Sequence, residues 1–222
     1  MCDRRRRVHS VKLKNVDILH SVEVRVLGAL LEKDMATPEY YPLTVNSLQN
    51  ACNQKSSREP VVNYDEETVA QALELLKTKQ LAMRISGAGH RVEKWGHRLG
   101  EKMNLGRREL ALLTVLMLRG PQTLGELRGR TERMHDFTDL DEVERVLDTL
   151  AHHEPEPLVA PAGRGRWVHL LGGPVETAAE PESHAMPASH PSRGGLEARV
   201  EALEQELAQL KRQFEEFQRK FE

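Results

Sequence analysis

The segment NACNQKSSREP, residues 50–60, gathers amide, hydroxyl and charged side chains where the neighbouring sequence has the pattern of amphipathic helices. Amide and guanidinium groups match base edges and phosphates, so this 50–60 segment is a candidate nucleic-acid contact. Asn, Ser and Pro also end helices and form turns, because their side chains bond to nearby backbone. If Asn53, Ser56 and Ser57 cap the end of a helix, Lys55 and Arg58 stay free to reach outward. A structural turn and a contact loop are both open at this point.

Residues suited to catalysis or metal binding are not grouped in a useful pattern. Catalysis needs a nucleophile with a base, paired carboxylates or a metal, and pairs such as Glu32 and Asp34 fall at helix ends or on solvated helix faces. Cys52 falls on an apolar face, which is typical of a core thiol. The ten histidines lack zinc spacing, and GAGH, residues 87–90, lies between two strands and does not open a helix, as a phosphate loop would. We expect no enzyme activity, metal site or cofactor.

The composition indicates a partly helical protein that stays in the cytoplasm. The chain has 222 residues, of which 39% are hydrophobic and 30% charged, and two cysteines. So few cysteines suggest a reducing compartment. No apolar run approaches the roughly 18 residues of a membrane span, and MCDRRRRVHS lacks the apolar core of a secretion signal. The net charge of -2 gives no overall attraction to nucleic acid, so any basic surface must be local.

Apolar periodicity predicts three helices followed by a hairpin. The helices begin near Ser21, Thr44 and Asp65, with the apolar residues of each on one face. In the first helix, Glu23 and Arg25 are expected to face water, and Ser21 to be the N-cap. LAMRIS and RVEKWGHRL alternate around a glycine turn, which is typical of two paired strands.

The same order of elements recurs in the second half of the sequence, with a shrinking offset between equivalent residues. A shrinking offset indicates a second copy that is shorter, mainly around the 50–60 segment. Two diverged copies of one module explain the pattern better than chance does. The equivalent pairs are Leu27 and Leu113, 86 positions apart, Thr44 and Thr123, 79 apart, Val69 and Val143, 74 apart, and Trp95 and Trp167, 72 apart.

Three helices closed by a hairpin are the arrangement of a winged helix. We therefore predict a mainly α protein with small β-hairpins, built from two tandem winged-helix domains and a C-terminal coiled-coil helix. No sheet should exceed three strands, and Trp95 and Trp167 should pack in the cores. The predicted parts are a flexible basic arm over 1–20, winged-helix domains over 21–102 and 103–173, a disordered linker over 174–195 and the coiled-coil tail over 196–222.

The tail carries a heptad seam, which is the pattern of a self-associating helix. The linker before it is rich in Pro, Gly, Ala and Ser and holds few large aliphatic residues, so it should not bury a core. Packing of the seam on the chain's own globular part is the alternative to a homo-oligomer, and the number of subunits stays open. The seam residues are Leu196, Val200, Leu203, Leu207, Leu210, Phe214, Phe217 and Phe221.

With these modules laid out, the sequence resembles the YceH family of bacterial proteins. The resemblance covers about residues 21–173, and the segments EKDMATPEYYPLT and NACNQKSSREP carry it most specifically. It implies two winged-helix domains in tandem, in agreement with the repeat. It implies little about activity, because the family is largely uncharacterised.

A DNA-binding or transcription-associated factor is the function that this fold favours. The outward positions of both third helices are acidic, with Glu66 and Glu67 in one and Asp141 and Glu144 in the other, so neither helix suits a phosphate-lined groove. The alternative is a protein-interaction adaptor, whose partner the sequence does not name. The candidate nucleic-acid contacts lie in the 50–60 segment and near the two hairpins: Lys55, Arg58, Arg84, Arg91, Lys94, Arg98, Arg164 and Arg166.

Overall fold

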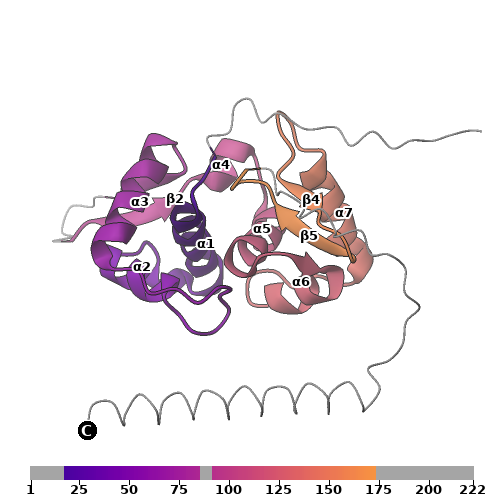
Figure 1. The fold of residues 1–222 in the computed structure, drawn as a ribbon, viewed down its shortest axis with the longest axis horizontal. Coiled ribbons are helices and arrows are strands. Elements are labelled where there is room, and N and C mark those ends of the chain that lie inside the picture. The colour runs from indigo at the N-terminus through magenta and orange to yellow at the C-terminus, as the bar shows by residue number, and fades with distance from the viewer. Residues whose placement is uncertain (1–17, 86–91, 174–222) are drawn as a thin grey trace, which may run out of the picture. The chain divides into compact units, whose positions relative to one another are not determined.

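The computed structural model describes residues 18–85 and 92–173, which together belong to one compact unit. The described chain is mainly helical, with two small antiparallel sheets (Figure 1). Its first half contains α1 (Ser21–Ala36), the short 3-10 helix η1 (Pro38–Tyr40), α2 (Val45–Cys52), α3 (Glu66–Thr78), β1 (Ala82–Ile85) and β2 (Lys94–His97).

The second half repeats the order of helices and closing strands. It also contains a short helix and a two-residue strand that the sequence pattern did not predict, α4 and β3. Its elements are α4 (Leu99–Met103), α5 (Arg107–Arg119), β3 (Gln122–Thr123), α6 (Leu124–Thr131), α7 (Leu140–Ala151), β4 (Val159–Pro161) and β5 (Arg166–His169).

Equivalent helices begin at equivalent caps in the two halves. The Thr44 hydroxyl accepts the backbone N–H of Ser47 at the start of α2, and Thr123 caps α6 in the same way. Asp65 and Asp139 cap α3 and α7. A side-chain oxygen at this position satisfies a backbone donor that the first turn leaves unpaired. The predicted repeat of helices is therefore confirmed at the level of individual caps.

The sheets extend the correspondence between the two halves. β1 pairs with β2, and the second sheet has the order β3-β5-β4. In the first half Leu43, just before α2, forms an isolated bridge with Trp95. In the second half Gln122, just before α6, pairs with Trp167. Each half therefore places a short extended segment beside its last strand. The residues involved are equivalent in the repeat, because Gln122 lies 79 positions after Leu43 and Trp167 lies 72 positions after Trp95.

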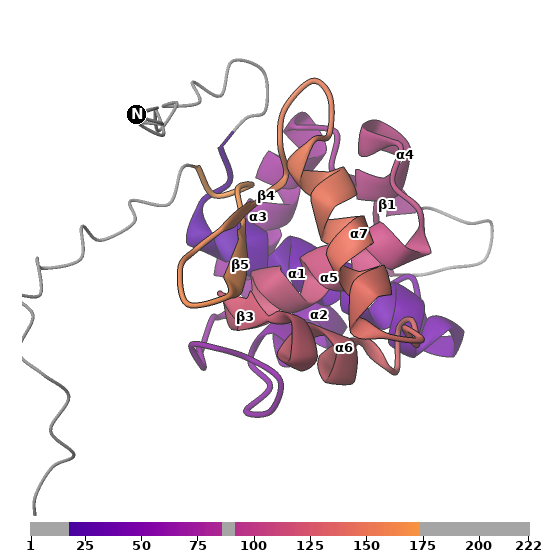
Figure 2. The ribbon, with the colours of Figure 1, turned by 90° about the vertical axis from the view of Figure 1, so that its right-hand side faces the viewer.

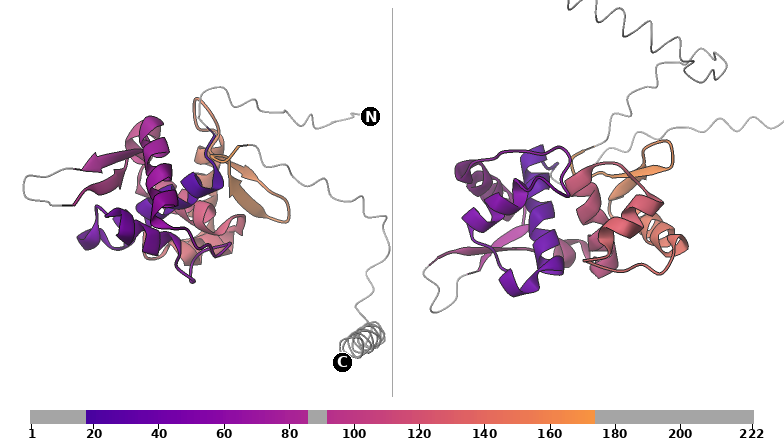
Figure 3. Two further views of the ribbon diagram at one scale, coloured as in Figure 1. Left: turned by 60° about the vertical axis from the view of Figure 1, so that its left-hand side comes forward. Right: turned by 90° about the horizontal axis from the view of Figure 1, so that it is seen from below.

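The two first helices, α1 and α5, form the centre of the unit. They pack against each other, with the β1–β2 hairpin and the β4–β5 hairpin at opposite ends (Figures 1, 2 and 3). Residues 110–118 of α5 are all buried, as are residues 23–31 of α1. A helix buried all round must cover a second surface besides its own half's core. One continuous core joins the two halves.

The expectation that Glu23 and Arg25 face water is wrong. Glu23 is buried, and its carboxylate is compensated there because it accepts the backbone N–H of His20 (2.8 Å) and pairs with Lys79 Nζ (2.8 Å). His20, and not Ser21, is therefore the N-cap of α1. Arg25 is buried and donates to the Pro60 carbonyl (2.6 Å). The apolar pattern predicted only one buried face of α1, whereas the structure covers α1 on both sides, with α3 and α5 among its neighbours.

Other parts of the predicted organisation lie outside the described residues. These are the basic arm up to residue 17, almost all of the linker, and the tail with its heptad seam. The boundary that we predicted near residue 102 also stays a prediction. The expected core positions of Trp95 and Trp167 fit the structure, with Trp95 buried and Trp167 partly buried against the core.

Candidate functional site

The predicted contacts of the β1–β2 hairpin differ in how much of their charge is available. Arg84 on β1 forms ion pairs with Glu74 of α3 and with Glu93 (3.2 Å), and its guanidinium lies 5.2 Å from the centre of the Trp95 ring. Arg98 pairs with Glu101 (3.0 Å). The Lys94 side chain makes no hydrogen bond or ion pair within the described ranges. Of the positions described here, Lys94 has the most available charge for a partner, and Arg91 lies outside them.

The β4–β5 hairpin shows the same division. Arg164 is exposed in the turn between the strands, at a φ of 49° between Gly163 and Gly165, which also have positive φ. It has no polar partner in the part of the chain that the structure describes. Arg166 on β5 instead pairs with Glu126 of α6 (3.1 Å). The tip of this hairpin thus presents an uncompensated guanidinium to solvent.

The third helices are acidic on their exposed sides, as the sequence indicated. Glu66 and Glu67 on α3 are exposed, and so are Asp141 and Glu144 on α7. Carboxylates on these faces would repel phosphate, whose neutralisation dominates DNA affinity. On these helices, which a helix-turn-helix usually inserts into a groove, carboxylates outnumber exposed basic side chains such as Arg145 of α7, whereas Lys94 and Arg164 at the hairpins have no carboxylate partner in the described ranges.

Within the 50–60 segment, the expectation that Arg58 reaches outward is wrong. Its side chain is fully buried and binds both carboxylate oxygens of Glu32 (3.0 and 2.6 Å). It also donates to the Ala51 carbonyl from Nε (3.0 Å) and Nη2 (2.8 Å). Burial alone would raise the pKa of Glu32, but the hydrogen bonds and charge of Arg58 outweigh it and lower that pKa. Arg58 therefore anchors the segment to α1 and to the end of α2.

Further bonds hold the 50–60 segment in a defined turn. The Asn53 side chain exchanges two hydrogen bonds with the backbone of Tyr64 (2.7 and 2.9 Å). Arg119 of α5 donates to the Ser57 hydroxyl (2.6 Å), and the Glu59 N–H donates to the Leu118 carbonyl (2.8 Å). The segment is thus a structural turn that joins the two halves. Lys55 is exposed, so a contact role for it stays a prediction.

Sequence reasoning missed the residues that make this junction. Glu32 looked like a solvated helix end, yet it meets Arg58, which lies 26 positions further along the chain. Arg25 carried a usable signal, since a charge inside the apolar run VEVRVLGALL must find a partner if the helix is buried. Arg119 at the end of α5 carried no comparable signal.

Cys52 is a core thiol, as expected. It is buried at the end of α2, and burial raises the pKa of the thiol to about 12. A thiol held in this form is a poor nucleophile and a poor metal ligand. Among residues 18–85 and 92–173, His, Cys, Asp and Glu nowhere cluster in threes suited to a metal, and no helix has the length and apolar character to span a bilayer.

Comparison with known proteins places this architecture in a family. The family model described as "Protein of unknown function, DUF480" matches residues 19–165. The chain belongs to the DUF480 family. A UPF0502 protein of Solibacter usitatus is 53% identical over 207 residues, covering 92% of this chain and 98% of the relative. UPF0502 proteins of Opitutus terrae and Pelobacter propionicus are 51% and 49% identical, covering 87% and 92% of this chain and 84% and 99% of the relatives.

The sequence match to the family covers both halves of the fold. The matched range runs from the start of α1 into the turn before β5, so it includes the α1–α5 junction and the 50–60 segment. Neither the family's description nor the names of these relatives state an activity. Function must therefore be argued from the geometry.

Proposed function

We propose that this DUF480 protein is a tandem winged-helix factor that binds DNA through its two hairpins, in a transcription-associated role without enzyme activity. The equivalence of Leu43–Trp95 and Gln122–Trp167 supports the winged-helix assignment most directly. In each half an extended segment before the second helix lies beside the last strand, as it does in a winged helix. The resemblance to the YceH family supports the same assignment.

The distribution of charge supports contact through the hairpins. Lys94 and Arg164 are the predicted hairpin contacts without an internal carboxylate partner in the described ranges. Contacts from these positions would go mainly to phosphate, which positions a protein on DNA without specifying sequence. Because the hairpins lie at opposite ends of the unit (Figure 3), they would touch two separated stretches of backbone. Self-association through the proposed coiled-coil tail would add further contacts and raise avidity.

The test is the salt dependence of binding to duplex DNA, measured by fluorescence anisotropy on the full chain. The logarithm of the affinity should fall linearly with the logarithm of salt concentration. Lys94→Ala and Arg164→Ala should each flatten the slope by about one unit or less. Arg145→Ala, an exposed arginine on α7, is the matched control and should leave the slope unchanged. Binding without salt dependence, or no binding, would defeat the proposal.

A protein-interaction adaptor is the second candidate, and one surface favours it. Leu75 of α3 is 50% exposed beside Val45, Ala70 and Trp95. Together these residues line a largely apolar groove between α3 and the β1–β2 hairpin. Exposed apolar surface of this kind is a common docking site for other proteins. If DNA binding fails and Leu75→Asp abolishes retention of a specific cellular protein, the adaptor replaces the DNA-binding proposal.

A further inference from the structure

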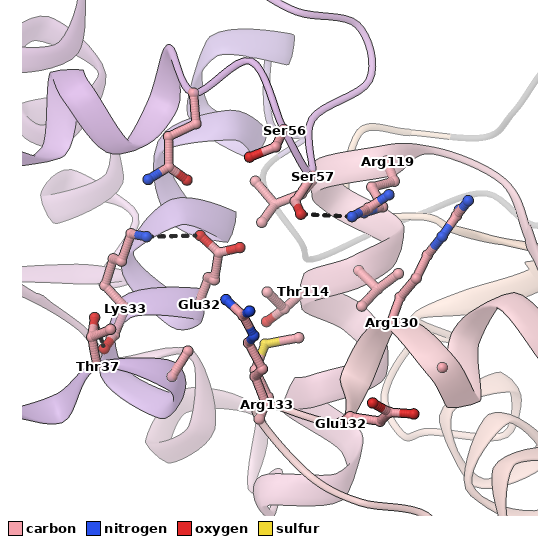
Figure 4. A pocket seen from close by; sticks show the side chains of 16 residues that line it. Glu32, Lys33, Thr37, Ser56, Ser57, Thr114, Arg119, Arg130, Glu132 and Arg133 are labelled. Carbon is pink, nitrogen blue, oxygen red and sulfur yellow. Dashed lines mark hydrogen bonds and ion pairs between the residues drawn. The ribbon is translucent and has the colours of Figure 1, made fainter.

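A polar cavity of about 560 Å³ lies where the two halves meet (Figure 4). One wall comes from the C-terminal end of α1 and from the 50–60 segment. The opposite wall comes from α5, α6 and the residues that follow α6. None of its lining residues belongs to either hairpin. The cavity is therefore distinct from the proposed DNA-contacting surfaces, and it is of a size suited to a small-molecule ligand.

The cavity carries more positive than negative charge. Four basic side chains line it, Lys33, Arg119, Arg130 and Arg133, against two carboxylates, Glu32 and Glu132. Glu32 is already neutralised by Arg58, which lies behind the wall, with Lys33 also at 3.4 Å. Of the two carboxylates in the lining, only Glu132 then remains to balance the basic side chains. A water-filled space with this balance attracts anions.

Two of the arginines have charge to spare for a ligand. Arg119 donates to the neutral Ser57 hydroxyl (2.6 Å) and forms no ion pair within the described ranges. Arg133 is exposed and, among residues 18–85 and 92–173, has no hydrogen bond or ion pair. By contrast, Arg130 is partly compensated by Glu126 at 3.6 Å. Figure 4 shows Arg133 reaching across the cavity toward Glu32, with Arg119 and Arg130 near each other at its far side.

Mutual repulsion within this group strengthens the argument. Burial lowers the pKa of Arg119, and the nearby charges of Arg130 and Arg58 lower it further, outweighing the opposite effects of Glu32 and Glu59. An arginine stays protonated even so, which means that like charges are held together at a free-energy cost. A bound anion would remove that cost. Because the Ser57 oxygen accepts from Arg119, its own O–H remains able to donate to the same anion.

We propose that this cavity binds a phosphorylated small molecule of about nucleotide size, with Arg119 and the Ser57 hydroxyl on one side and Arg133 on the other making the contacts to its phosphoryl groups. Planar guanidinium groups bind phosphate oxygens in pairs, and hydroxyls complete such sites. A DNA duplex is too wide to enter a cavity of this volume. Since the walls come from both halves, a ligand here would brace one half against the other. This goes beyond the proposed DNA binding and does not depend on it.

The test uses the full chain with methyl-labelled methionine, observed by NMR during titration. Met134 lines the cavity, whereas Met83 is 40% exposed on β1 and does not line it. Inorganic pyrophosphate and adenosine diphosphate are the probes, with potassium chloride at matched ionic strength as the blank. Saturable shifts of the Met134 methyl, without shifts of Met83, are the expected result. Tighter binding of the diphosphate nucleotide than of pyrophosphate would assign the nucleoside part to the cavity as well, and equal affinity would assign the phosphoryl group alone.

Variants separate recognition from a general charge effect. Arg133→Gln should weaken the affinity at least about tenfold, because it removes a charge-assisted contact, and Arg133→Lys should retain part of it. Arg145→Gln, on α7, should change nothing. Arg133 has no internal partner among the described residues, so the thermal midpoint of the Arg133 variants should equal that of the parent.

Three results would overturn the proposal: no saturation of the Met134 shift by either probe at about 10 mM, unchanged affinity in Arg133→Gln, or shifts of Met134 that only duplex DNA produces. DNA affinity measured on Arg133→Gln keeps the two proposals apart. If DNA binding persists while both probes fail, only the small-molecule site is lost. If both probes bind and DNA does not, only the DNA-binding proposal is lost.

Discussion

The connection between the second and third helices differs most between the two halves. In the first half, residues 53–64 separate α2 from the cap of α3, and in the second half, residues 132–138 separate α6 from the cap of α7. The longer connection reaches out to α1 and α5. The shorter one is bound to its own half, where Arg128 of α6 donates to the carbonyls of Phe137 and Thr138. The additional five residues of the first copy thus serve to join the halves.

The two connections are also anchored by different physical chemistry. The shorter one inserts Phe137, which is fully buried and packs edge-on against the His135 ring with 4.6 Å between ring centres. The longer one inserts Arg58, whose charge is compensated by Glu32 of α1. An apolar side chain can pack into any hydrophobic pocket of suitable size, whereas a buried arginine requires a carboxylate and carbonyls at defined positions. The ionic anchor therefore specifies where the connection docks.

The largest expected effect comes from removing that ionic anchor. Arg58→Ala leaves the largely buried Glu32 with only the more distant Lys33 at 3.4 Å, which should lower the free energy of unfolding by about 3–5 kcal/mol in urea denaturation. Arg58→Lys should recover little, because an ammonium cannot reproduce the paired geometry. Arg133→Ala, on the other connection, is the matched control and should change stability by less than about 0.5 kcal/mol.

The double variant Arg58→Met with Glu32→Met removes both charges. If its free energy of unfolding lies closer to that of the parent than that of Arg58→Ala does, the loss in Arg58→Ala comes from the uncompensated carboxylate. If Arg58→Ala is as stable as the parent, the first connection is not anchored through Arg58. The contrast between the ionic and the apolar anchor would then fail.

The α1–α5 junction should respond next most strongly. A Cβ placed on Gly28 would lie 3.0 Å from Leu118 Cδ2 and 3.2 Å from Met117 Cβ, so Gly28→Val should force α1 and α5 apart and destabilise the protein by about 1–3 kcal/mol. Gly125 in α6 has open space around it. Gly125→Ala should therefore stabilise by roughly 0.5–1 kcal/mol, through helix propensity alone. Thermal unfolding of both variants measures the difference. A stable Gly28→Val protein would mean that the two helices are not held at this distance.

The parts of the fold that the sequence predicted are those set by local chemistry. Thr44, Thr123, Asp65 and Asp139 cap the second and third helices of both copies. A cap and an apolar period are both contained within a few neighbouring residues. The closing strands with Trp95 and Trp167 were predicted for a similar reason, since alternation around glycines is a short-range signal.

The predictions from the sequence were wrong where elements distant in the chain cover a helix face that its own pattern suggests is exposed. Glu23 and Arg25 were expected in water, because the pattern of one helix does not show that α3, the 50–60 segment and α5 surround α1. The position of Arg58 depends on Glu32, 26 residues away, and no local pattern relates them. The candidate cavity is still less accessible to sequence reasoning, because its walls exist only once the halves have packed.

A smaller effect should appear in the pH dependence of stability, through the last strand of the second half. His169 is partly buried, and desolvation of its ring lowers its pKa to about 4. The unfolded chain then binds a proton that the folded one refuses, so stability should fall as the pH drops from about 6.5 toward 4. The loss from this group should be on the order of 1 kcal/mol at pH 5.5. His169→Leu should remove that part of the pH dependence in urea denaturation at several pH values. An identical pH profile in the variant would show that His169 does not contribute.

The smallest expected effect separates the two roles that the 50–60 segment first suggested. Arg58 and Lys55 lie three positions apart, but Arg58 is buried while Lys55 is exposed. Lys55→Ala should therefore leave the melting temperature unchanged within the scatter of surface substitutions, about 0.5 kcal/mol. If Lys55 contacts DNA phosphate, the same variant should flatten the salt slope by about one unit or less. An unchanged slope would mean that Lys55 makes no contact with DNA phosphate, and the segment would then have only its structural role in DNA binding. A fall in melting temperature would instead show that Lys55 also supports the turn, so that neither basic side chain of the segment is left for a partner to contact independently of the fold.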